Sequence, residues 1–580
     1  MNGQPKAPFY LALFAVVGGL IAFAVYRSDV FAPKGNVQQP PGATDIDPKA
    51  LGNTAESADT SSVTTVKEYT FKPAERLPEV KGISAYKPLE DNTVRFALNV
   101  WAGWGPIILA NDGFKPGRVW KTSDGKEFKV ELVLIDNPVA MRDAYAAGEV
   151  QIGWATLDMM PLFMEGFVDK SGKPRDSRVM PRVFQQIDWS NGGDGIVSRA
   201  DIKTIGDLRG KKVVLAQNSP SHYFLLNMLV AGGVQPSEVD MIFTEDAFQA
   251  AAAFNARPDA AAAVSWAPDI YNLADAKGNR MLVNTQTANK LIADVWFARA
   301  DFAKDHPDKI EALVRGIFDA MEDLKSDENK AKCAKLMADG YNIPATETIK
   351  MFGDAHSTNW AENYQFFLNQ NNPTNFERVW SQAYYLYRRI GAITHQPLKF
   401  DTVMDFSVIE KLGKDPKYSS QKDEYQVRLA PKAVADIHAE SDEILTNTIV
   451  IQFFPNSWDL YSKIDRDANG VKKEVLYDPN VDNVLQEVAK LAGQFSAARI
   501  IVEGHTDGSR RGQVPEAMVK ELSLNRANSV REALVNKYQM DPNRFAAAGL
   551  GWERPADPND PENHAKNRRV EIKVYTAEKQ

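Results

Sequence analysis

The sequence predicts an α/β protein with more than one domain behind a single membrane-spanning helix, and three patterns lead to this prediction. From about Thr93, short apolar strands alternate with helical segments. A second, shorter alternation begins at about Ile444, and an apolar stretch without any charge, residues 8–26, precedes both. Because 580 residues are too many for one hydrophobic core, we expect at least two α/β domains.

The N-terminal stretch PFYLALFAVVGGLIAFAVY, residues 8–26, predicts a transmembrane helix after a short cytoplasmic tail, residues 1–7. At the α-helical rise this length just crosses a hydrocarbon core of ~30 Å. A cleaved signal peptide is the alternative, since Ala22-Phe23-Ala24 has the small-residue spacing of a cleavage site. The apolar run is longer than such peptides need, so we expect an uncleaved, single-pass inner-membrane anchor with the bulk of the chain in the periplasm.

The next region, residues 27–90, is predicted to be a disordered linker with a short lead-in to the first domain. Residues 28–67 are rich in Pro, Gly, Ser, Thr and Asp and show no apolar periodicity, which is typical of a flexible tether. The net charge of −8 argues against nucleic acid as a partner. Cys333 is the only cysteine, so no internal disulfide is possible, and we expect a buried structural thiol.

The strands of the middle region are expected at residues 94–100, 128–135 and 150–155, and again after Gly210 within KKVVLA, VDMIF and AAAAVSW. Ligands of open α/β sheets bind beyond the carboxyl ends of the strands, where helix starts favour an anion. The candidate ligand-binding residues in and around these positions are Trp101, Gly103, Trp104, Thr156, Asp158, Ser190, Ser219, Ser221, His222, Trp266 and Asp269.

The segments NVWAGWGPIILAND, GEVQIGWATLD, IDWSNGGDGIVSR, DLRGKKVVLAQNSPSHYFLL and AAAAVSWAPDI resemble periplasmic substrate-binding proteins of the nitrate, sulfonate and taurine class. The resemblance runs from about Asp91 to Leu398 and places this domain at residues 91–425. It implies the type II periplasmic binding protein fold, with two lobes joined by crossings near residues 187–199 and 292–299, and a cleft that closes on a small, anionic or sulfonate-like ligand. An ABC-type permease or an envelope sensor would be the partner.

Several of these residues also have structural interpretations. Trp104 is equally compatible with an ordinary core position, and Ser219 and Ser221 with N-caps of the following helix. His222 could serve only as a structural hydrogen-bonding group, and Asp269 could cap a helix. The run Gly192-Gly193-Asp194-Gly195 lacks the Lys-Ser/Thr of a phosphate loop, so we expect a turn there.

The C-terminal region, residues 426–580, is predicted to be a smaller α/β domain with strands at TIVIQFFP, ARIIVEGH, FAAAGLG and RRVEIKVY. The motifs VEGHTDG, LSLNRANSVREAL, FAAAGLGWERP and NRRVEIKV resemble the OmpA-like peptidoglycan-binding domain. The resemblance implies that Asp507 and Arg526 bind the diaminopimelate of the wall stem peptide. Arg569, in the NRR motif, is a further candidate, with a structural ion pair as the equally plausible alternative. Two departures concern the rim of this site: residues 508–521 look longer than usual, and Val519 replaces an expected Asn.

No metal or cofactor is expected. The stretch Asp465–Gly470 matches the first half of a calcium loop, but Leu476 stands where the loop needs a Glu, so a polar hairpin turn is favoured. Nothing resembles a nucleophile–base pair, which argues against an enzyme. The sequence therefore predicts a solute-binding protein attached to the membrane and the wall. An envelope tether with an unused cleft, or an enzyme on the same scaffold, are the alternatives.

Overall fold

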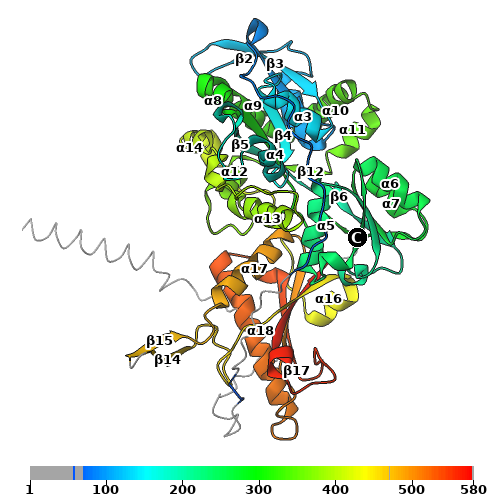
Figure 1. The fold of residues 1–580 in the computed structure, drawn as a ribbon, viewed down its shortest axis with the longest axis vertical. Coiled ribbons are helices and arrows are strands. Elements are labelled where there is room, and N and C mark those ends of the chain that lie inside the picture. The colour runs from blue at the N-terminus through cyan, green and yellow to red at the C-terminus, as the bar shows by residue number, and fades with distance from the viewer. Residues whose placement is uncertain (1–55, 59–68, 469–470, 578–580) are drawn as a thin grey trace, which may run out of the picture. The chain divides into compact units, whose positions relative to one another are not determined.

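The computed structural model describes residues 56–58, 69–468 and 471–577 (Figure 1). The predicted membrane helix and most of the predicted tether lie outside these residues. Within the described part of the chain, no helix has both the length and the apolar character needed to span a bilayer. The described residues form a larger domain with two sheets and a C-terminal domain with one further sheet and a hairpin.

The first lobe is built on a seven-stranded sheet in the order β12-β5-β11-β4-β1-β3-β2, in which β1, β3 and β4 run parallel. Its central strand β4, with the sequence IGWAT, is buried along its whole length, as expected for a parallel strand covered on both faces. The strands of this lobe are β1 Thr93–Leu98, β2 Val119–Lys121, β3 Glu127–Leu134, β4 Ile152–Thr156, β5 Pro181–Ser190, β11 Ala293–Arg299 and β12 Ala355–Ser357.

The second lobe has a five-stranded sheet in the order β10-β6-β9-β7-β8. Its strands are β6 Asp194–Arg199, β7 Lys212–Ala216, β8 Asp240–Thr244, β9 Ala262–Trp266 and β10 Asn279–Asn284. The chain passes between the sheets twice, from β5 to β6 and from β10 to β11. The two-lobed prediction is therefore confirmed. The first crossing lies within the expected range, and the second begins slightly earlier than expected.

Helices cover both sheets of this domain, and several show clear local reasons for their start. Asn137 caps α3 by accepting a hydrogen bond from the Ala140 backbone N–H, and Asp246 caps α6 in the same way. The helices are α2 Gly105–Asn111, α3 Pro138–Ala146, α4 Met160–Phe167, α5 Pro220–Ala231, α6 Ala247–Ala256, α7 Asp269–Asp275, α8 Ala300–Asp305, α9 Pro307–Asp323, α10 Asp327–Tyr341, α11 Ala345–Met351, α12 Trp360–Leu368, α13 Phe376–Arg389, α14 Ser407–Leu412 and α15 Pro416–Ser419.

The larger domain also tests the predictions made for Cys333 and for the lead-in before the first strand. Cys333 is buried on α10, where its thiol lies 3.2 Å from the Gly105 carbonyl, so the structural interpretation is confirmed. The lead-in from residue 69 does not behave as a free tether. The Tyr69 hydroxyl donates to the Val230 carbonyl at 2.9 Å, and the Ala74 N–H donates to the Ile390 carbonyl at 2.8 Å. The lead-in from residue 69 is thus bound to the larger domain.

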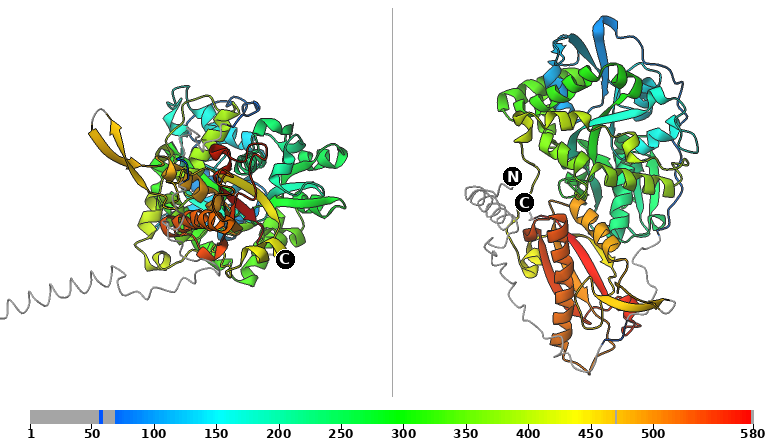
Figure 2. Two further views of the ribbon diagram at one scale, coloured as in Figure 1. Left: turned by 90° about the horizontal axis from the view of Figure 1, so that it is seen from below. Right: turned by 90° about the vertical axis from the view of Figure 1, so that its left-hand side faces the viewer.

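The C-terminal domain has a four-stranded sheet in the order β13-β18-β16-β17. Helices α17 and α18 cover one face, and Figure 2 shows the long α18 lying along the strands. Helix α16 packs Ile437 against Ile501 on the other face. The elements are α16 Val434–Glu440, β13 Glu443–Ile449, β14 Lys463–Ala468, β15 Val471–Leu476, α17 Val481–Gln494, β16 Arg499–His505, α18 Glu516–Tyr538, β17 Phe545–Gly551, α19 His564–Asn567 and β18 Arg569–Tyr575.

The C-terminal domain departs from the prediction at one strand and one helix start, and agrees with it at the hairpin. Strand β13 begins at Glu443 and ends at Ile449, so most of the predicted TIVIQFFP strand is not a strand. Helix α18 begins at Glu516, inside the segment that looked like an insertion, so Arg526 lies in mid-helix and not near its start. The hairpin expected around residues 465–470 is present as the antiparallel pair β14–β15.

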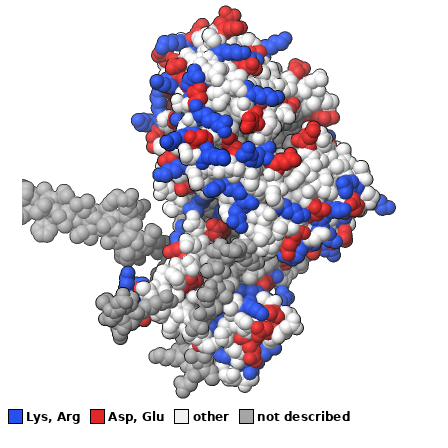
Figure 3. All heavy atoms as spheres, in the orientation of Figure 1, with Lys and Arg blue, Asp and Glu red and all other residues white. Residues whose placement is uncertain are grey.

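Figure 3 shows acidic and basic side chains interspersed over the visible face of the larger domain, with no broad basic patch. This mixed surface agrees with the small negative net charge.

Candidate functional site

Three predicted residues, Thr156, Asp158 and Ser221, and their neighbour Tyr223 lie between the two lobes with buried polar side-chain atoms. Thr156 and Asp158 follow β4 of the first lobe, whereas Ser221 and Tyr223 lie in the first turn of α5 in the second lobe. Among the described residues, the Thr156, Ser221 and Tyr223 hydroxyls and both Asp158 carboxylate oxygens make no well-formed hydrogen bond, although Asp158 faces the Thr156 and Tyr387 hydroxyls and Tyr223 faces Asn227. Buried polar atoms are normally hydrogen-bonded, so this set, the interlobe group, is the candidate ligand site.

Trp101 and Gly103 lie against Asp188 of β5. The indole N–H of Trp101 donates to the Asp188 carboxylate at 3.1 Å. A Cβ at Gly103 would stand 1.5 Å from the same carboxylate, and a Cβ at Gly193 would stand 2.5 Å from the Trp101 ring. The two glycines therefore allow the loop after β1 and the first crossing to approach each other closely.

Ser190 belongs to a hydrogen-bonded network at the first crossing. Its hydroxyl lies 2.7 Å from the Asp194 carboxylate and 2.8 Å from the Thr285 hydroxyl. The Thr285 hydroxyl in turn accepts from the Gly192 backbone N–H at 2.8 Å. Residues 191–193 form a bend between β5 and β6, so the turn expected at the glycine run is confirmed. This network ties the two crossings together.

The remaining predicted residues do not join the interlobe group. The Trp104 indole is fully buried and donates to Asn99 at 2.7 Å, which makes it a core residue. The Ser219 hydroxyl donates to the Ala216 carbonyl, and His222 accepts from the Asn218 N–H and lies against Phe243. Burial lowers the pKa of His222 to about 3, so this imidazole is neutral. Asp269 opens α7, and both it and Trp266 are partly exposed.

Sequence reasoning missed four buried acids, Asp188, Asp194, Asp294 and Asp354. Asp294 of β11 lies opposite Asp188 of β5 and Thr156 of β4 in the sheet register. The available signal was an acidic residue inside otherwise apolar crossing strands, IDW and IADV. Tyr387 of α13, which faces Asp158, carried no local signal.

Burial dominates the electrostatics of this region. It raises the pKa of Asp158 to about 7, with a further contribution from Asp194. Burial likewise raises the pKa of Asp188 to about 7 and that of Asp194 to about 6. The pKa of Asp294 lies well above its usual range because of burial and of the neighbouring carboxyl groups of Asp188, Asp194 and Asp158.

These shifts predict that the ligand-free protein loses stability as the pH rises from about 4 to about 8. The unfolded chain ionises its aspartates near pH 3.8, whereas the folded chain holds the protons to higher pH, so the folded state binds more protons in this window. We expect Asp158→Asn to be more stable than wild type at pH 8, with the gap closing by pH 4. Each pKa unit corresponds to ~1.4 kcal/mol. The melting temperatures of Asp158→Asn and wild type, measured from pH 4 to pH 8, check this expectation. The exposed Asp201→Asn is the control. A stability difference between the two proteins that does not change with pH would contradict the raised pKa of Asp158.

In the C-terminal domain, two glycines bring α18 against the sheet. A Cβ at Gly504 of β16 would stand 2.0 Å from the Ser523 carbonyl oxygen, and one at Gly549 of β17 would stand 2.1 Å from the Lys520 carbonyl oxygen. The Ser523 hydroxyl accepts from the Gly551 N–H at 3.0 Å. This close approach places Arg526 beside the end of β16, where Asp507 follows.

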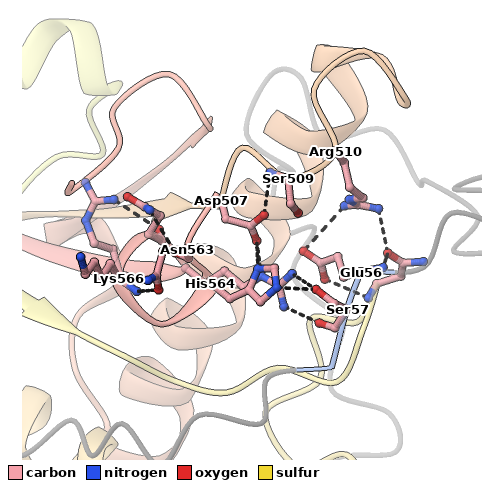
Figure 4. Close-up of polar contacts among 12 residues, drawn as sticks. Glu56, Ser57, Asp507, Ser509, Arg510, Asn563, His564 and Lys566 are labelled. Atoms are coloured by element: carbon pink, nitrogen blue, oxygen red, sulfur yellow. Dashed lines mark hydrogen bonds and ion pairs between the residues drawn. The ribbon is translucent and has the colours of Figure 1, made fainter. Parts of the chain in front are cut away.

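Asp507 is almost fully buried at that strand end (Figure 4). Its carboxylate accepts from the Ser509 N–H at 2.9 Å and from the Arg568 guanidinium, and His564 Nδ1 lies 3.3 Å away. Burial opposes ionisation, but the Arg568 guanidinium and the Ser509 hydrogen bonds hold the pKa of Asp507 below its usual range. Arg568, the first Arg of the NRR motif, was missed in favour of Arg569.

A small pocket lies next to Arg568, the partner of Asp507, and three arginines line it. Its lining includes Arg526, Arg568, Arg569, His505 and Phe453. Arg526 donates to the Ser457 carbonyl at 2.9 Å and lies over the Phe453 ring. The third predicted residue, Arg569, pairs with Glu571 at 2.7 Å. Such a pocket, with fixed guanidinium groups and a carboxylate, can bind a zwitterion that carries carboxylates and an ammonium.

One group in this domain has the donor types of a metal site. Glu503, His505 and Glu571 offer ligand atoms within 4.8 Å of one another. Lys573 Nζ lies 3.3 Å from Glu503, and Arg569 donates to Glu571. Because these cations already neutralise the carboxylates, the group does not favour a metal ion.

Comparison with known proteins divides the chain in the same way. Residues 190–331 match the family model described as NMT1/THI5 like, and residues 472–569 match the OmpA family. The chain is 28% identical over 212 residues to the taurine-binding periplasmic protein of Escherichia coli, a match that covers 35% of this chain and 62% of that protein. It is 38% identical over 116 residues to outer membrane protein Omp38 of Acinetobacter baumannii, covering 19% of this chain and 31% of that protein.

The chain thus spans less than two thirds of either relative. Among solved structures, the periplasmic aliphatic sulphonate-binding protein SsuA from Escherichia coli matches with 17% identity and a TM-score of 0.40, covering 54% of this chain and 96% of that one. The desulfurization enzyme DSZB matches with 15% identity and a TM-score of 0.39, covering 55% and 98%.

Proposed function

We propose that this chain, which joins an NMT1/THI5-like substrate-binding domain to a C-terminal OmpA domain, captures a small solute while its C-terminal domain holds the cell wall. The observation that carries solute capture is the interlobe group, because both lobes contribute buried polar atoms that lack partners. A binding protein that closes on its ligand satisfies such atoms with the ligand itself. Solutes of the sulfonate or taurine class are the first candidates, bound without turnover and passed to an ABC-type permease or an envelope sensor.

The wall-binding part of the proposal rests on the pocket of Asp507 and Arg526. Both side chains are almost fully buried and held in place by charge-assisted contacts, Asp507 by Arg568 and Arg526 by Glu56, so a charged head group would meet groups in fixed positions. Diaminopimelate, with its free ammonium and carboxylate, fits this charge pattern. Residues 8–26 would anchor the chain in the inner membrane with both domains in the periplasm. The intact mass of protein extracted from membranes tests this, since a chain starting after Ala24 would contradict it.

The proposed function is tested on the full chain in two measurements. Taurine, propanesulfonate and nitrate are screened by thermal shift. At a ligand concentration 100-fold above Kd, binding adds ~2.7 kcal/mol to stability, which is easily seen. Co-sedimentation with purified peptidoglycan, with free diaminopimelate as competitor, tests the second part. Absence of any stabilising solute would favour the tether with an unused cleft, and turnover of a bound solute would favour an enzyme.

A further inference from the structure

The interlobe region contains an unusual concentration of buried acids. Asp158 and Asp188 are fully inaccessible, and Asp194, Asp294 and Asp354 are at most 8% exposed. They come from the end of β4, from both crossings and from the loop before β12. Their mutual influence on pKa, described above for Asp158, Asp188, Asp194 and Asp294, shows that they share one electrostatic environment.

Among the residues that the structure describes, none of the five acids forms an ion pair. Their hydrogen-bond partners are neutral donors or one another: the Trp101 indole for Asp188, the Ser190 hydroxyl for Asp194 and the Tyr271 hydroxyl for Asp354, whereas Asp188 and Asp294 face each other across the sheet. Buried carboxylates are normally paired with a cation or kept protonated, since an isolated buried charge is very costly. In the ligand-free chain these acids therefore hold their protons to higher pH, and a cation bound among them would stabilise their charged form.

A second observation, on hydrogen bonding, concerns the same place. The Thr156, Ser221 and Tyr223 hydroxyls are at least nine-tenths buried and make no well-formed hydrogen bond within the described chain. The same holds for both carboxylate oxygens of Asp158. Asp158 faces Thr156 and Tyr387, and its charge also reaches Tyr223. Hydroxyls from both lobes thus surround the most deeply buried acid.

We propose that the solute bound between the lobes carries an organic ammonium group, received by Asp158 and Asp294 and flanked by the rings of Tyr223 and Tyr387. This inference rests on the proposed function and names its ligand class. In the described chain, Glu503, His505 and Glu571 are the only three such side chains whose ligand atoms lie within 4.8 Å of one another, so no three of the five acids form a comparable metal-binding group. An organic cation spans such a set and is also stabilised by aromatic faces. A sulfonate on the same molecule is compatible with this arrangement.

Matched pairs of probes test the ammonium group by calorimetry on the full chain. Taurine is compared with isethionate, which replaces the amine by a hydroxyl, and ethanolamine is compared with ethylene glycol. We expect the amine of each pair to bind at least tenfold tighter, and the preference to grow from pH 5.5 to pH 8 as the acids ionise. Asp158→Asn should remove the preference, whereas Asp201→Asn should keep it.

The outcomes separate this proposal from the proposed function. Isethionate binding as tightly as taurine, or amine binding that weakens as the pH rises, overturns the ammonium assignment but leaves solute capture intact. Binding of none of the four probes counts against both.

A second observation, in the C-terminal pocket, is independent of the first. Glu56 lies in this pocket with only 3% of its surface exposed (Figure 4). Arg526 donates to its Oε1 at 3.1 Å and also to its Oε2, and Arg510 Nη2 lies 3.6 Å from Oε1. The Asn456 backbone N–H donates to Oε2 at 3.0 Å. Burial alone would raise the pKa of Glu56, but Arg526, Arg568 and Arg510 lower it to about 2.

Ser57 continues the contact toward Asp507. Arg568 donates to the Ser57 carbonyl at 2.7 Å, and the Ser57 hydroxyl lies 2.7 Å from His564 Nε2. Arg568 and His564 are the same side chains that contact Asp507. Glu56 and Ser57 therefore engage Arg526 on one side and the Asp507 partners on the other, which are the groups assigned to the wall peptide.

The geometry points to Glu56-Ser57 as an internal ligand that competes with the wall peptide, and to Arg510 as an additional carboxylate-binding residue of the pocket. Arg510 comes from the segment 508–521, which is longer than the resemblance leads one to expect. Its guanidinium contacts both Asn456 and Glu56. Wall attachment then requires that Glu56 leave Arg526, so the chain binds peptidoglycan more weakly than its pocket alone would.

Peptidoglycan binding by Glu56→Gln and Glu56→Ala tests this competition in the full chain. We expect both variants to bind at least fivefold tighter than wild type, whereas Glu79→Gln, an exposed glutamate, should bind like wild type. The acetylated peptide of residues 54–58, added in excess, should reverse the gain. In wild type, hydrogen exchange of the Asn456 amide should be slow, and it should speed up in Glu56→Gln.

Loss of the Glu56 contact could instead destabilise the pocket, and the exchange measurement covers that case. Unchanged Asn456 exchange together with unchanged wall binding in Glu56→Gln overturns the proposal. Weaker wall binding in both variants that the peptide 54–58 restores also overturns it, because Glu56 would then build the pocket and not compete for it.

Discussion

Arg526→Ala is expected to reduce binding of the full chain to purified peptidoglycan by ~30-fold or more. Arg526 is almost fully buried and helps to line the pocket of the C-terminal domain. Removing one partner of a buried, hydrogen-bonded charge pair typically costs ~2–5 kcal/mol, and ~1.4 kcal/mol corresponds to tenfold in affinity. Co-sedimentation with peptidoglycan over a range of protein concentrations measures the loss.

The control for this variant lies on the same helix. Arg531→Ala removes an arginine that lies outside the pocket-lining set, so it should bind the wall like wild type. Circular dichroism shows whether Arg526→Ala stays folded. A folded Arg526→Ala protein that still pellets with peptidoglycan would mean that Arg526 holds the loop at Ser457 and that the wall binds elsewhere.

The domain order and most strands could be predicted because periodicity is a local property of the sequence. Strand β17 was placed at its exact bounds from FAAAGLG, since a short apolar run between turn signals has few alternatives. The TIVIQFFP strand was misplaced because its apolar residues continue past Ile449 into irregular chain, while β13 starts among the polar residues from Glu443. Pairing with β18 decides this register, and pairing is not a local property.

Each site residue that sequence reasoning missed owes its role to a partner that is far away in the sequence. Glu56 lies 470 positions from Arg526, in a stretch whose composition is typical of a tether. Asp294 and Asp188 come together only through the two crossings. Arg510 stands in a segment that looked like an insertion. By contrast, Asp507 and Arg526 were found from their motifs, and Thr156 and Asp158 from their place after a strand.

The two sites also use charge in opposite ways. Between the lobes, five buried carboxylates lack a cation, whereas in the C-terminal pocket Arg510, Arg526 and Arg568 gather around Glu56 and Asp507. If both proposals hold, each site would select its ligand through the charge that the ligand supplies. Ionic strength should affect both weakly, because buried pairs are screened less than exposed ones.

Gly504→Ala is expected to destabilise the C-terminal domain by ~3 kcal/mol or more and to lower its melting temperature by roughly 10 °C. The added methyl group would stand 2.0 Å from the backbone carbonyl of Ser523, in the middle of α18, where no side-chain rotation can relieve the overlap. The helix must move away from β16, and Arg526 moves with it, so wall binding should weaken even where the domain stays folded. Differential scanning calorimetry measures the shift.

The matched control is Gly117→Ala in the larger domain, where a Cβ meets nothing within 4 Å. This variant should leave both unfolding transitions unchanged. A Gly504→Ala protein as stable as this control would show that α18 does not depend on the glycine contact to reach the sheet.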